Sequence, residues 1–292
     1  MSIFATKILL ATDGSEEAEL AARTAADLAA KTGSELHVVH VLVLPPEALR
    51  DPFGTEARKE FEKRGRERLD ELVGRLEASG GAVGGAHLRV GSPAAEIVAQ
   101  AEELGAGMVV LGSRGLGAMR RALMGSVSDS VVRHAPCPVL VVRSEPLAFP
   151  TKILLATDGS EEATLAASTA AELAKGTDSE LHVVHVGSFV PTFLAATEEE
   201  PGRAAREARK TLDNEVGRIQ AADGTVVQAH LRVGGAPEEV VVLAEDMGAG
   251  LIVMGSRGRG GIRRALMGSV SETVMRHAHC PVFLVRGDDG GR

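Results

Sequence analysis

The chain has 292 residues, 44% of them hydrophobic and 25% charged, so it is long enough for one sizeable core in each of two domains. Its net charge of −8 and its lack of Trp and Tyr argue against general nucleic-acid binding, which selects basic faces and aromatic stacking platforms. No apolar run approaches the roughly 18 residues of a membrane span, and the N-terminus shows no signal-peptide pattern. We therefore expect a cytoplasmic protein whose partners are small molecules or proteins, with no nucleic acid and no membrane.

Short apolar strands alternate with helical patterns through the first half of the chain. Strands are predicted at 7–11, 36–44, 87–90, 108–111 and 138–142, and helices at 15–31, 55–79, 93–104 and 126–134. Gly33 ends the first helix, and Pro93 suits the first turn of the third. The order βαβαβαβαβ with nearly all-apolar strands predicts an α/β fold: a parallel sheet covered on both faces, which binds ligands beyond the carboxyl ends of its strands.

The second half of the chain repeats the first. Residues 6–15 return without change as 151–160, and residues 34–41 return as 179–186. A repeat of this length is a whole domain rather than a solenoid unit, whose period is roughly 20 to 50 residues. The sequence therefore predicts two tandem α/β domains, 1–145 and 146–292.

A glycine framework stands out in both halves. Gly112-Ser-Arg-Gly115 is followed after nine residues by Gly125-Ser-Val-Ser128, and residues 255–258 and 268–271 repeat both runs at the same spacing. Each copy lies between an apolar strand and a helix start. Glycine accepts φ > 0 and lets backbone N–H groups approach an anion, and a helix N-terminus favours phosphate. We expect a phosphate-binding loop in each half, although a plain turn is the simpler alternative for one copy alone.

Charged groups near this framework have two interpretations each. Asp13 follows the first strand and either caps the next helix or, because Ser15 is an equally good N-cap, contacts a ribose hydroxyl or a metal ion on phosphate. The arginines of the loops either neutralise phosphate charge or form solvated surface. These arginines are Arg114, Arg120 and Arg121, matched by Arg257, Arg263 and Arg264.

The histidines and cysteines are better explained by structure than by catalysis. His40 and His185 lie inside apolar strands, as expected for hydrogen-bonded core imidazoles. His134 and His277 lie near helix C-termini, where they offset the helix dipole. Cys137 and Cys280 precede closing strands and have no nearby cysteine partner, so we expect small buried residues.

Three features together resemble the universal stress protein family. They are Asp13-Gly-Ser15 after the first strand, the spacing Gly-x2-Gly-x9-Gly-Ser, and the closing run Arg133-His-Ala-Pro-Cys-Pro-Val-Leu-Val-Val142. The resemblance covers both halves nearly end to end and is of the tandem type. It implies a five-stranded sheet of order 3-2-1-4-5 in each domain, ATP in members that keep this glycine spacing, and domains that pair through their fifth strands, within one chain or in a homodimer.

The resemblance also implies a set of binding residues. In the first half, the adenosine and phosphate contacts would come from Ala11, Thr12, Asp13, Val41, Leu111, Gly112, Arg114, Gly115, Gly125, Ser126, Val127 and Ser128. In the second half they would come from Ala156, Thr157, Asp158, Val186, Met254, Gly255, Arg257, Gly258, Gly268, Ser269, Val270 and Ser271. Asp13 and Asp158 would face Mg²⁺ brought in with ATP.

The sequence favours nucleotide binding over catalysis. It has no Gly-x4-Gly-Lys-Ser/Thr run, no Gly-x-Gly-x-x-Gly after the first strand, no nucleophile with a base beside it and no Cys/His cluster with metal spacing. The leading hypothesis is an ATP-binding stress-response or signalling module, not an enzyme, that acts on an unidentified protein partner. A slow ATPase or nucleotidyl-transfer enzyme, and a structural interaction module with vestigial pockets, are the alternatives.

The two halves diverge within the nine-residue spacer of the glycine framework, at residues 116–119 against 259–262. Leu116 and Ala118 become Arg259 and Gly261, which predicts unequal nucleotide affinity. Residues 198–202 predict a disordered excursion over the second pocket.

Overall fold

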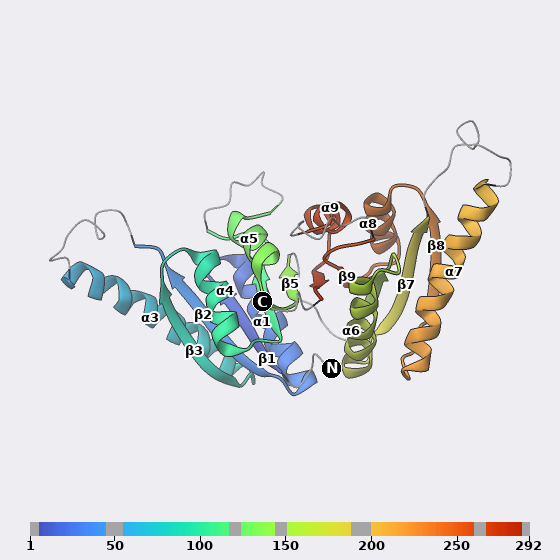
Figure 1. The fold of residues 1–292 in the computed structure, drawn as a ribbon. Helices are drawn as coiled ribbons and strands as arrows, with labels where there is room; N and C mark the ends of the chain where they lie inside the picture. The colour runs from blue at the N-terminus through green and yellow to red at the C-terminus, as the bar shows by residue number, and fades with distance from the viewer. Residues whose placement is uncertain are drawn as a thin grey trace. The chain divides into compact units, whose positions relative to one another are not determined.

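The computed structural model describes residues 6–44, 55–116, 124–143, 151–187, 200–259 and 267–287. These residues form two units that divide between Pro146 and Leu147, and each unit holds one copy of the sequence repeat. Figure 1 shows the elements of each unit.

The first unit alternates strands and helices throughout. Its elements are β1 (Lys7–Thr12), α1 (Glu16–Thr32), β2 (Glu35–Leu42), α3 (Thr55–Ala78), β3 (Val83–Val90), α4 (Pro93–Leu104), β4 (Met108–Gly112), α5 (Ser126–His134) and β5 (Val139–Val142). Neighbouring strands are parallel, in the order β3-β2-β1-β4-β5. The predicted fold class and strand order are confirmed.

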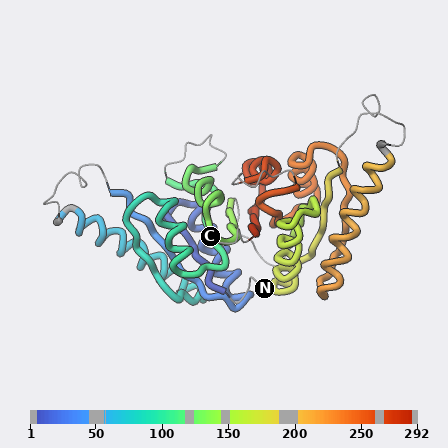
Figure 2. The backbone as a smooth tube through the Cα atoms, in the orientation of Figure 1, coloured from blue at the N-terminus to red at the C-terminus, as the bar shows by residue number. Residues whose placement is uncertain are grey.

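The second unit has the same succession of elements, which Figure 2 traces along the chain. They are β6 (Lys152–Ala156), α6 (Glu161–Thr177), β7 (Glu180–Gly187), α7 (Glu200–Ala221), β8 (Gln228–Val233), α8 (Ala236–Asp246), β9 (Leu251–Gly255), α9 (Ser269–His277) and β10 (Val282–Val285). The strands are again parallel, in the order β8-β7-β6-β9-β10.

Helices cover both faces of each sheet (Figure 1). In the first unit α1 and α3 lie on one face and α4 and α5 on the other, and in the second unit α6 and α7 lie opposite α8 and α9. The central strands are therefore buried on both sides, and Ile8, Leu9 and Leu10 have no exposed surface. This burial explains why the strands read as continuous apolar runs rather than alternating ones.

Helix α1 begins shortly after β1 and thereby brings its first turn to the carboxyl edge of the sheet. The Oγ of Ser15 accepts a hydrogen bond from the backbone N–H of Ala18 at 3.3 Å, which caps the helix. Its buried face is largely alanine, so the helix approaches the sheet closely. Gly33 ends it with a φ of 66°, as the sequence predicted.

Two local predictions were wrong. Strand β3 begins at Val83 rather than at His87, because Gly84 and Gly85 have the composition of a loop but lie in the strand, with Gly85 paired to His37 of β2 and Gly84 at a shift in register. A Cβ on Gly85 would lie 2.6 Å from Nδ1 of His37, so the strand needs glycine there. The excursion predicted at 198–202 is also wrong over residues 200–202, which open helix α7; residues 198–199 lie outside the described residues.

The predicted burial of the two cysteines is confirmed. Cys137 and Cys280 are buried and form no disulfide. Within the described ranges, none of the helices combines the length and the hydropathy needed to cross a bilayer.

The second unit buries an acidic side chain that the first unit lacks. Glu215 of α7 has no exposed surface, and the repeat aligns it with Leu72 of α3. Its Oε2 accepts a hydrogen bond from Oγ1 of Thr157 at 3.1 Å, but its Oε1 is buried without a hydrogen-bond partner in the described structure. Burial raises the pKa of the Glu215 carboxyl, against the opposing effects of Thr157 and of Arg218.

Replacing Glu215 with Leu is expected to stabilise the second domain by about 1–3 kcal/mol at neutral pH, because it removes a buried, incompletely bonded carboxyl. A raised native pKa stabilises the fold below the unfolded-state pKa, and that stability is lost as pH rises through the native pKa. The gain should therefore be larger at about pH 7 than at about pH 5. Thermal unfolding followed by circular dichroism measures it.

The reciprocal change is the matched control. Leu72→Glu places a carboxyl at the equivalent position of the first domain, so it should destabilise the protein, and more so at about pH 7 than at about pH 5. A Glu215→Leu gain that is the same at both pH values would contradict the assignment of Glu215 as the pH-sensitive group.

Candidate functional site

The carboxyl ends of β1, β2 and β4 open into one cavity of about 760 Å³. Strand register sets this geometry, because Ala11 pairs with both Val39 and Leu111. The cavity is lined by all twelve residues predicted for the first half: Ala11, Thr12, Asp13, Val41, Leu111, Gly112, Arg114, Gly115, Gly125, Ser126, Val127 and Ser128. The structure thus brings together residues that are more than a hundred positions apart in the chain.

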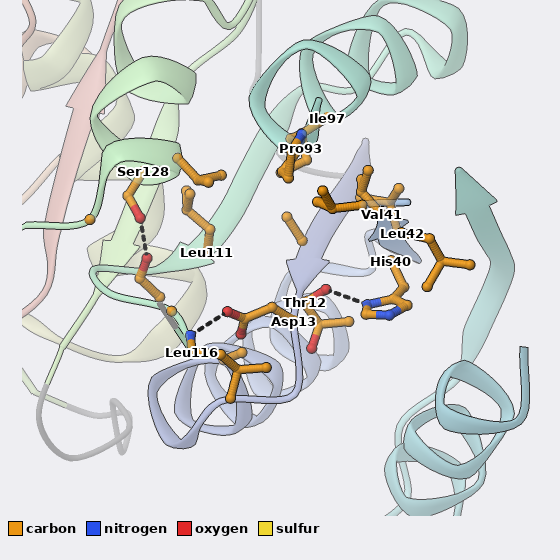
Figure 3. Close-up of a pocket in the computed structure, with 18 of the residues that line it drawn as sticks. Thr12, Asp13, His40, Val41, Leu42, Pro93, Ile97, Leu111, Leu116 and Ser128 are labelled. Carbon is orange, nitrogen blue, oxygen red and sulfur yellow. Dashed lines mark hydrogen bonds between the residues drawn. The ribbon is translucent and has the colours of Figure 1, made fainter. Parts of the chain in front are cut away.

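Asp13 ties the end of β1 to the loop after β4 (Figure 3). Its Oδ1 accepts a hydrogen bond from the backbone N–H of Ser15 at 3.0 Å, and its Oδ2 accepts one from the N–H of Leu116 at 2.8 Å. Ser15 caps α1, which leaves Asp13 to the loop. A ligand hydroxyl or cation at Asp13 would use the remaining lone pairs of these two oxygens.

The loop glycines are needed for close packing, which corrects the expectation of left-handed backbone. Neither Gly112 nor Gly115 has a positive φ. A Cβ on Gly112 would lie 2.9 Å from the backbone carbonyl carbon of Glu17, and a Cβ on Gly115 would collide with Oδ2 of Asp13. Their missing side chains let the β4 loop lie against the first turn of α1.

Glu17 holds this loop in place. Its Oε2 accepts hydrogen bonds from Oγ of Ser113 and from the backbone N–H of Arg114, both at 2.6 Å, and its Oε1 accepts one from Nε of Arg114 at 2.5 Å. Hydrogen bonds to an ionised, largely buried carboxylate are among the stronger ones in proteins. Sequence reasoning missed Glu17, although an acidic residue recurs at this position, as Glu162, in the second half.

Helix α5 opens onto the cavity without a side-chain cap. Its N-cap is Gly125, whose backbone N–H donates to the carbonyl of Ser113 at 2.8 Å. Within the described residues the N–H groups of Ser126 and Val127 donate to no side chain, and the positive end of the helix dipole faces the cavity. The Ser128 hydroxyl instead donates to the carbonyl of Gly112 at 2.8 Å, so it fastens the helix to β4 (Figure 3).

Apolar side chains form the rest of the wall. Pro93 and Ile97 of α4 line the cavity together with Val41 and Leu111 (Figure 3). His40 also lines it, which sequence reasoning missed, and its Nδ1 donates to the carbonyl of Thr12 at 2.8 Å. The carbonyl only accepts, so Nδ1 carries a proton and His40 is the hydrogen-bonded core imidazole that the sequence predicted.

The second unit repeats this site. A cavity of about 700 Å³ is lined by all twelve residues predicted there: Ala156, Thr157, Asp158, Val186, Met254, Gly255, Arg257, Gly258, Gly268, Ser269, Val270 and Ser271. Asp158 accepts backbone hydrogen bonds from Ser160 and Arg259 at 2.9 and 2.8 Å. Glu162 accepts from Oγ of Ser256 at 2.8 Å and from the backbone N–H of Arg257 at 2.6 Å. Helix α9 also begins at a glycine without a side-chain cap.

The universal stress protein family model matches residues 5–143 and again residues 150–286. The chain belongs to the universal stress protein family. It is a tandem member, because each domain matches the model separately.

Known proteins resemble this tandem universal stress protein over nearly its whole length. A universal stress protein of Mycobacterium tuberculosis strain H37Rv is 33% identical over 296 residues, which cover 96% of each chain. One of Mycolicibacterium smegmatis is 33% identical over 294 residues with the same coverage. Among solved structures, a universal stress protein from Archaeoglobus fulgidus matches with a TM-score of 0.74 at 26% identity and covers 99% of both chains.

The structure of this universal stress protein describes only part of each loop that was predicted to contact phosphate. Arg120, Arg121, Arg263 and Arg264 lie outside the described residues, as do Ala118 and Gly261. Within those ranges, no group of three His, Cys, Asp or Glu side chains is arranged to hold a metal ion.

Removing the Glu17 carboxylate should loosen the β4 loop. Glu17→Ala is expected to destabilise the first domain by about 1–3 kcal/mol, because Ser113 and Arg114 lose their common acceptor. Chemical unfolding measures the loss, and hydrogen exchange at the Arg114 amide should accelerate.

Glu16→Ala is the matched control, since Glu16 is exposed and shares the first turn of α1 and its dipole. Equal destabilisation by the two variants would show that Glu17 acts through the helix dipole alone.

Proposed function

We propose that each domain of this universal stress protein binds one ATP molecule, and that the bound nucleotide, not its turnover, serves the stress-response or signalling role by favouring one conformation or assembly. The observation that carries the proposal is a helix N-terminus without a side-chain cap, opening onto a cavity with apolar walls, in both domains. Such a helix start is a ready-made site for phosphate.

The residues of the cavity fit the parts of ATP. Volumes of about 760 and 700 Å³ lie within the range of roughly 300–1,000 Å³ that ligand pockets occupy. The apolar wall of Val41, Pro93 and Ile97 suits a flat base, and the N–H groups of Ser126 and Val127 suit phosphate oxygens. The carboxylate of Asp13 lies between these ends along β1, where a ribose hydroxyl or a phosphate-bound Mg²⁺ would meet it.

The titratable groups of the first cavity support binding rather than turnover. Both carboxylate oxygens of Asp13 accept backbone hydrogen bonds, and the His40 imidazole donates to a backbone carbonyl. The Arg114 guanidinium pairs with Glu17. These groups hold the shape of the loop, and none of them pairs with a nucleophile in the manner of an activated hydroxyl or thiol.

ATP should bind with a stoichiometry of two per chain and remain intact. Because the chain has neither Trp nor Tyr, any co-purified adenine would dominate its ultraviolet absorption. Calorimetry on nucleotide-free protein with Mg-ATP measures the stoichiometry, and chromatography of the incubated nucleotide measures hydrolysis. A protein without the adenine band and without a calorimetric signal would overturn the proposal, whereas rapid formation of ADP would make the protein an enzyme.

Gly125→Val should abolish binding at the first site and spare the second. The backbone at Gly125 has φ −77° and ψ 150°, which valine tolerates, but a Cβ there already lies 3.4 Å from the Ser113 carbonyl oxygen and from Cα of Arg114. The added methyl groups must then enter the phosphate space or displace the loop. Calorimetry should report one ATP per chain.

Gly74→Val on α3 is the matched control, because a Cβ at Gly74 meets nothing within 4 Å and the residue does not line the cavity. It should keep both sites. Two ATP molecules bound to the Gly125→Val variant would contradict the assignment of Gly125 to the binding site.

A further inference from the structure

The two pockets differ along one stripe of the long helix that follows each second strand. On α3, the residues that line the first cavity are Phe61, Arg64, Gly65 and Arg68. On α7, the residues at the equivalent positions of the second cavity are Ala204, Glu207, Ala208 and Thr211. Their spacing puts each set on one helix face. All four positions differ, whereas the twelve predicted site positions differ between the domains only at Leu111 and Met254.

The loss of the arginine at position 68 of the first domain is compensated in the second domain by an arginine on the loop after β9. The first domain has Arg68 on the helix and Leu116 on the loop, whereas the second has Thr211 on the helix and Arg259 on the loop. In both domains the arginine lines the cavity. The arginine lost from the helix in the second domain is therefore replaced by one on the loop.

Both arginines lie near the glycine that follows the first-strand aspartate, Gly14 or Gly159, but only Arg259 comes within 4 Å of a Cβ placed on that glycine. A Cβ on Gly159 would lie 2.6 Å from Nη2 of Arg259 and 2.9 Å from Cγ2 of Thr211, so the loop arginine reaches the helix stripe beside that glycine. In the first domain the equivalent Gly14 lines a smaller cavity of about 310 Å³ together with Arg68. The change from Leu116 to Arg259, which on sequence alone predicted unequal affinity, is thus balanced by the change from Arg68 to Thr211.

The charge reversal from Arg64 to Glu207 has no such balance. The charged residues that line the first cavity are Asp13, Arg64, Arg68 and Arg114. Those that line the second are Asp158, Glu207, Arg257 and Arg259. The first lining is therefore two unit charges more positive.

The charges of Arg64 and Glu207 are only weakly neutralised by ion pairs within their own helices. Arg64 pairs with Glu60, and Glu207 pairs with Arg203, each at 3.0 Å and one helical turn away. All four side chains are exposed, and exposed pairs of this kind are weak. Arg68 forms no ion pair with any residue in the described ranges. A charged ligand at the cavity mouth would therefore feel both guanidinium groups of the α3 stripe.

We propose that the α3 and α7 stripes make the two nucleotide sites unequal: the first selects the highly charged triphosphate, and the second discriminates little between ATP, ADP and AMP. The inference rests on the proposed function, since it assigns a preference to the same sites. Because Arg64 and Glu207 are exposed, their effect is a long-range Coulomb attraction or repulsion that salt screens. Arg64 and Glu207 are the specificity-determining residues.

Calorimetry on full-length single-site forms tests the asymmetry, with Gly268→Val to isolate the first site and Gly125→Val to isolate the second. The probes are ATP, ADP and AMP at ionic strengths of about 0.01 M and about 1 M, where the Debye length falls from about 30 Å to about 3 Å. At low salt, the ratio of the AMP to the ATP dissociation constant should be several-fold larger at the first site. At high salt the two ratios should converge.

Charge variants in the otherwise unaltered chain assign the cause. Arg64→Glu should lower the ratio of the AMP to the ATP dissociation constant at the first site only. Glu207→Arg should raise that ratio at the second site only. The matched control is Arg58→Glu, which makes the same charge change on α3 at an exposed residue that does not line the cavity. Circular dichroism confirms that each variant is folded.

The outcomes separate the two proposals. ATP binding with equal nucleotide ratios and equal salt dependence at both sites would overturn the asymmetry and leave the proposed function standing. An equal effect of Arg58→Glu and Arg64→Glu would also overturn it, because net charge alone would then explain the shift. No binding of any adenine nucleotide to the wild-type chain would overturn the proposed function itself.

Discussion

The site depends on the contact between the first turn of α1 and the loop that follows β4. Two carboxylates, Asp13 before the helix and Glu17 in its first turn, accept backbone hydrogen bonds from Leu116 and Arg114. The contact requires glycine at 112, since any side chain there would strike the backbone of the helix. It joins the neighbouring parallel strands β1 and β4 just beyond their carboxyl ends. This contact fixes the position of the loop after β4, which forms part of the cavity wall.

This arrangement determines what kind of binding site the domain offers. The acidic side chains are bonded to the protein itself, so the positive character of the pocket comes from backbone N–H groups, from the start of α5 and from arginines at its edge. Such a pocket tolerates change on the neighbouring helix, because the helix supplies none of the backbone donors. After duplication the α3 and α7 stripes diverged in charge, and Leu72 and Glu215 diverged in polarity. The backbone hydrogen bonds that Asp13 and Glu17 accept from the loop recur at Asp158 and Glu162.

Much of the fold was predictable because its signals are local. Continuous apolar runs marked the buried strands, Ser15 and Gly33 marked the ends of α1, and strand β3 was placed too late only because its glycines resemble a loop. The twelve residues expected at each site do line one cavity, since parallel strands end at the same edge. The reason for the glycines was not predictable, because it lies in packing against Glu17 and Asp13, which are about a hundred residues distant in the chain.

The sequence by itself determined the duplication, the alternation of strands and helices, the family resemblance and the residues that meet at the strand ends, because repetition and periodicity are properties of the chain alone. Only the tertiary structure decided which groups those residues bond. It showed that Glu17 holds the glycine loop, that the Ser128 hydroxyl is bonded within the protein, and that Arg68 and Arg259 line their cavities from different elements. Such facts depend on distances across the sheet edge, and residue spacing along a chain does not encode them until the strands are in register.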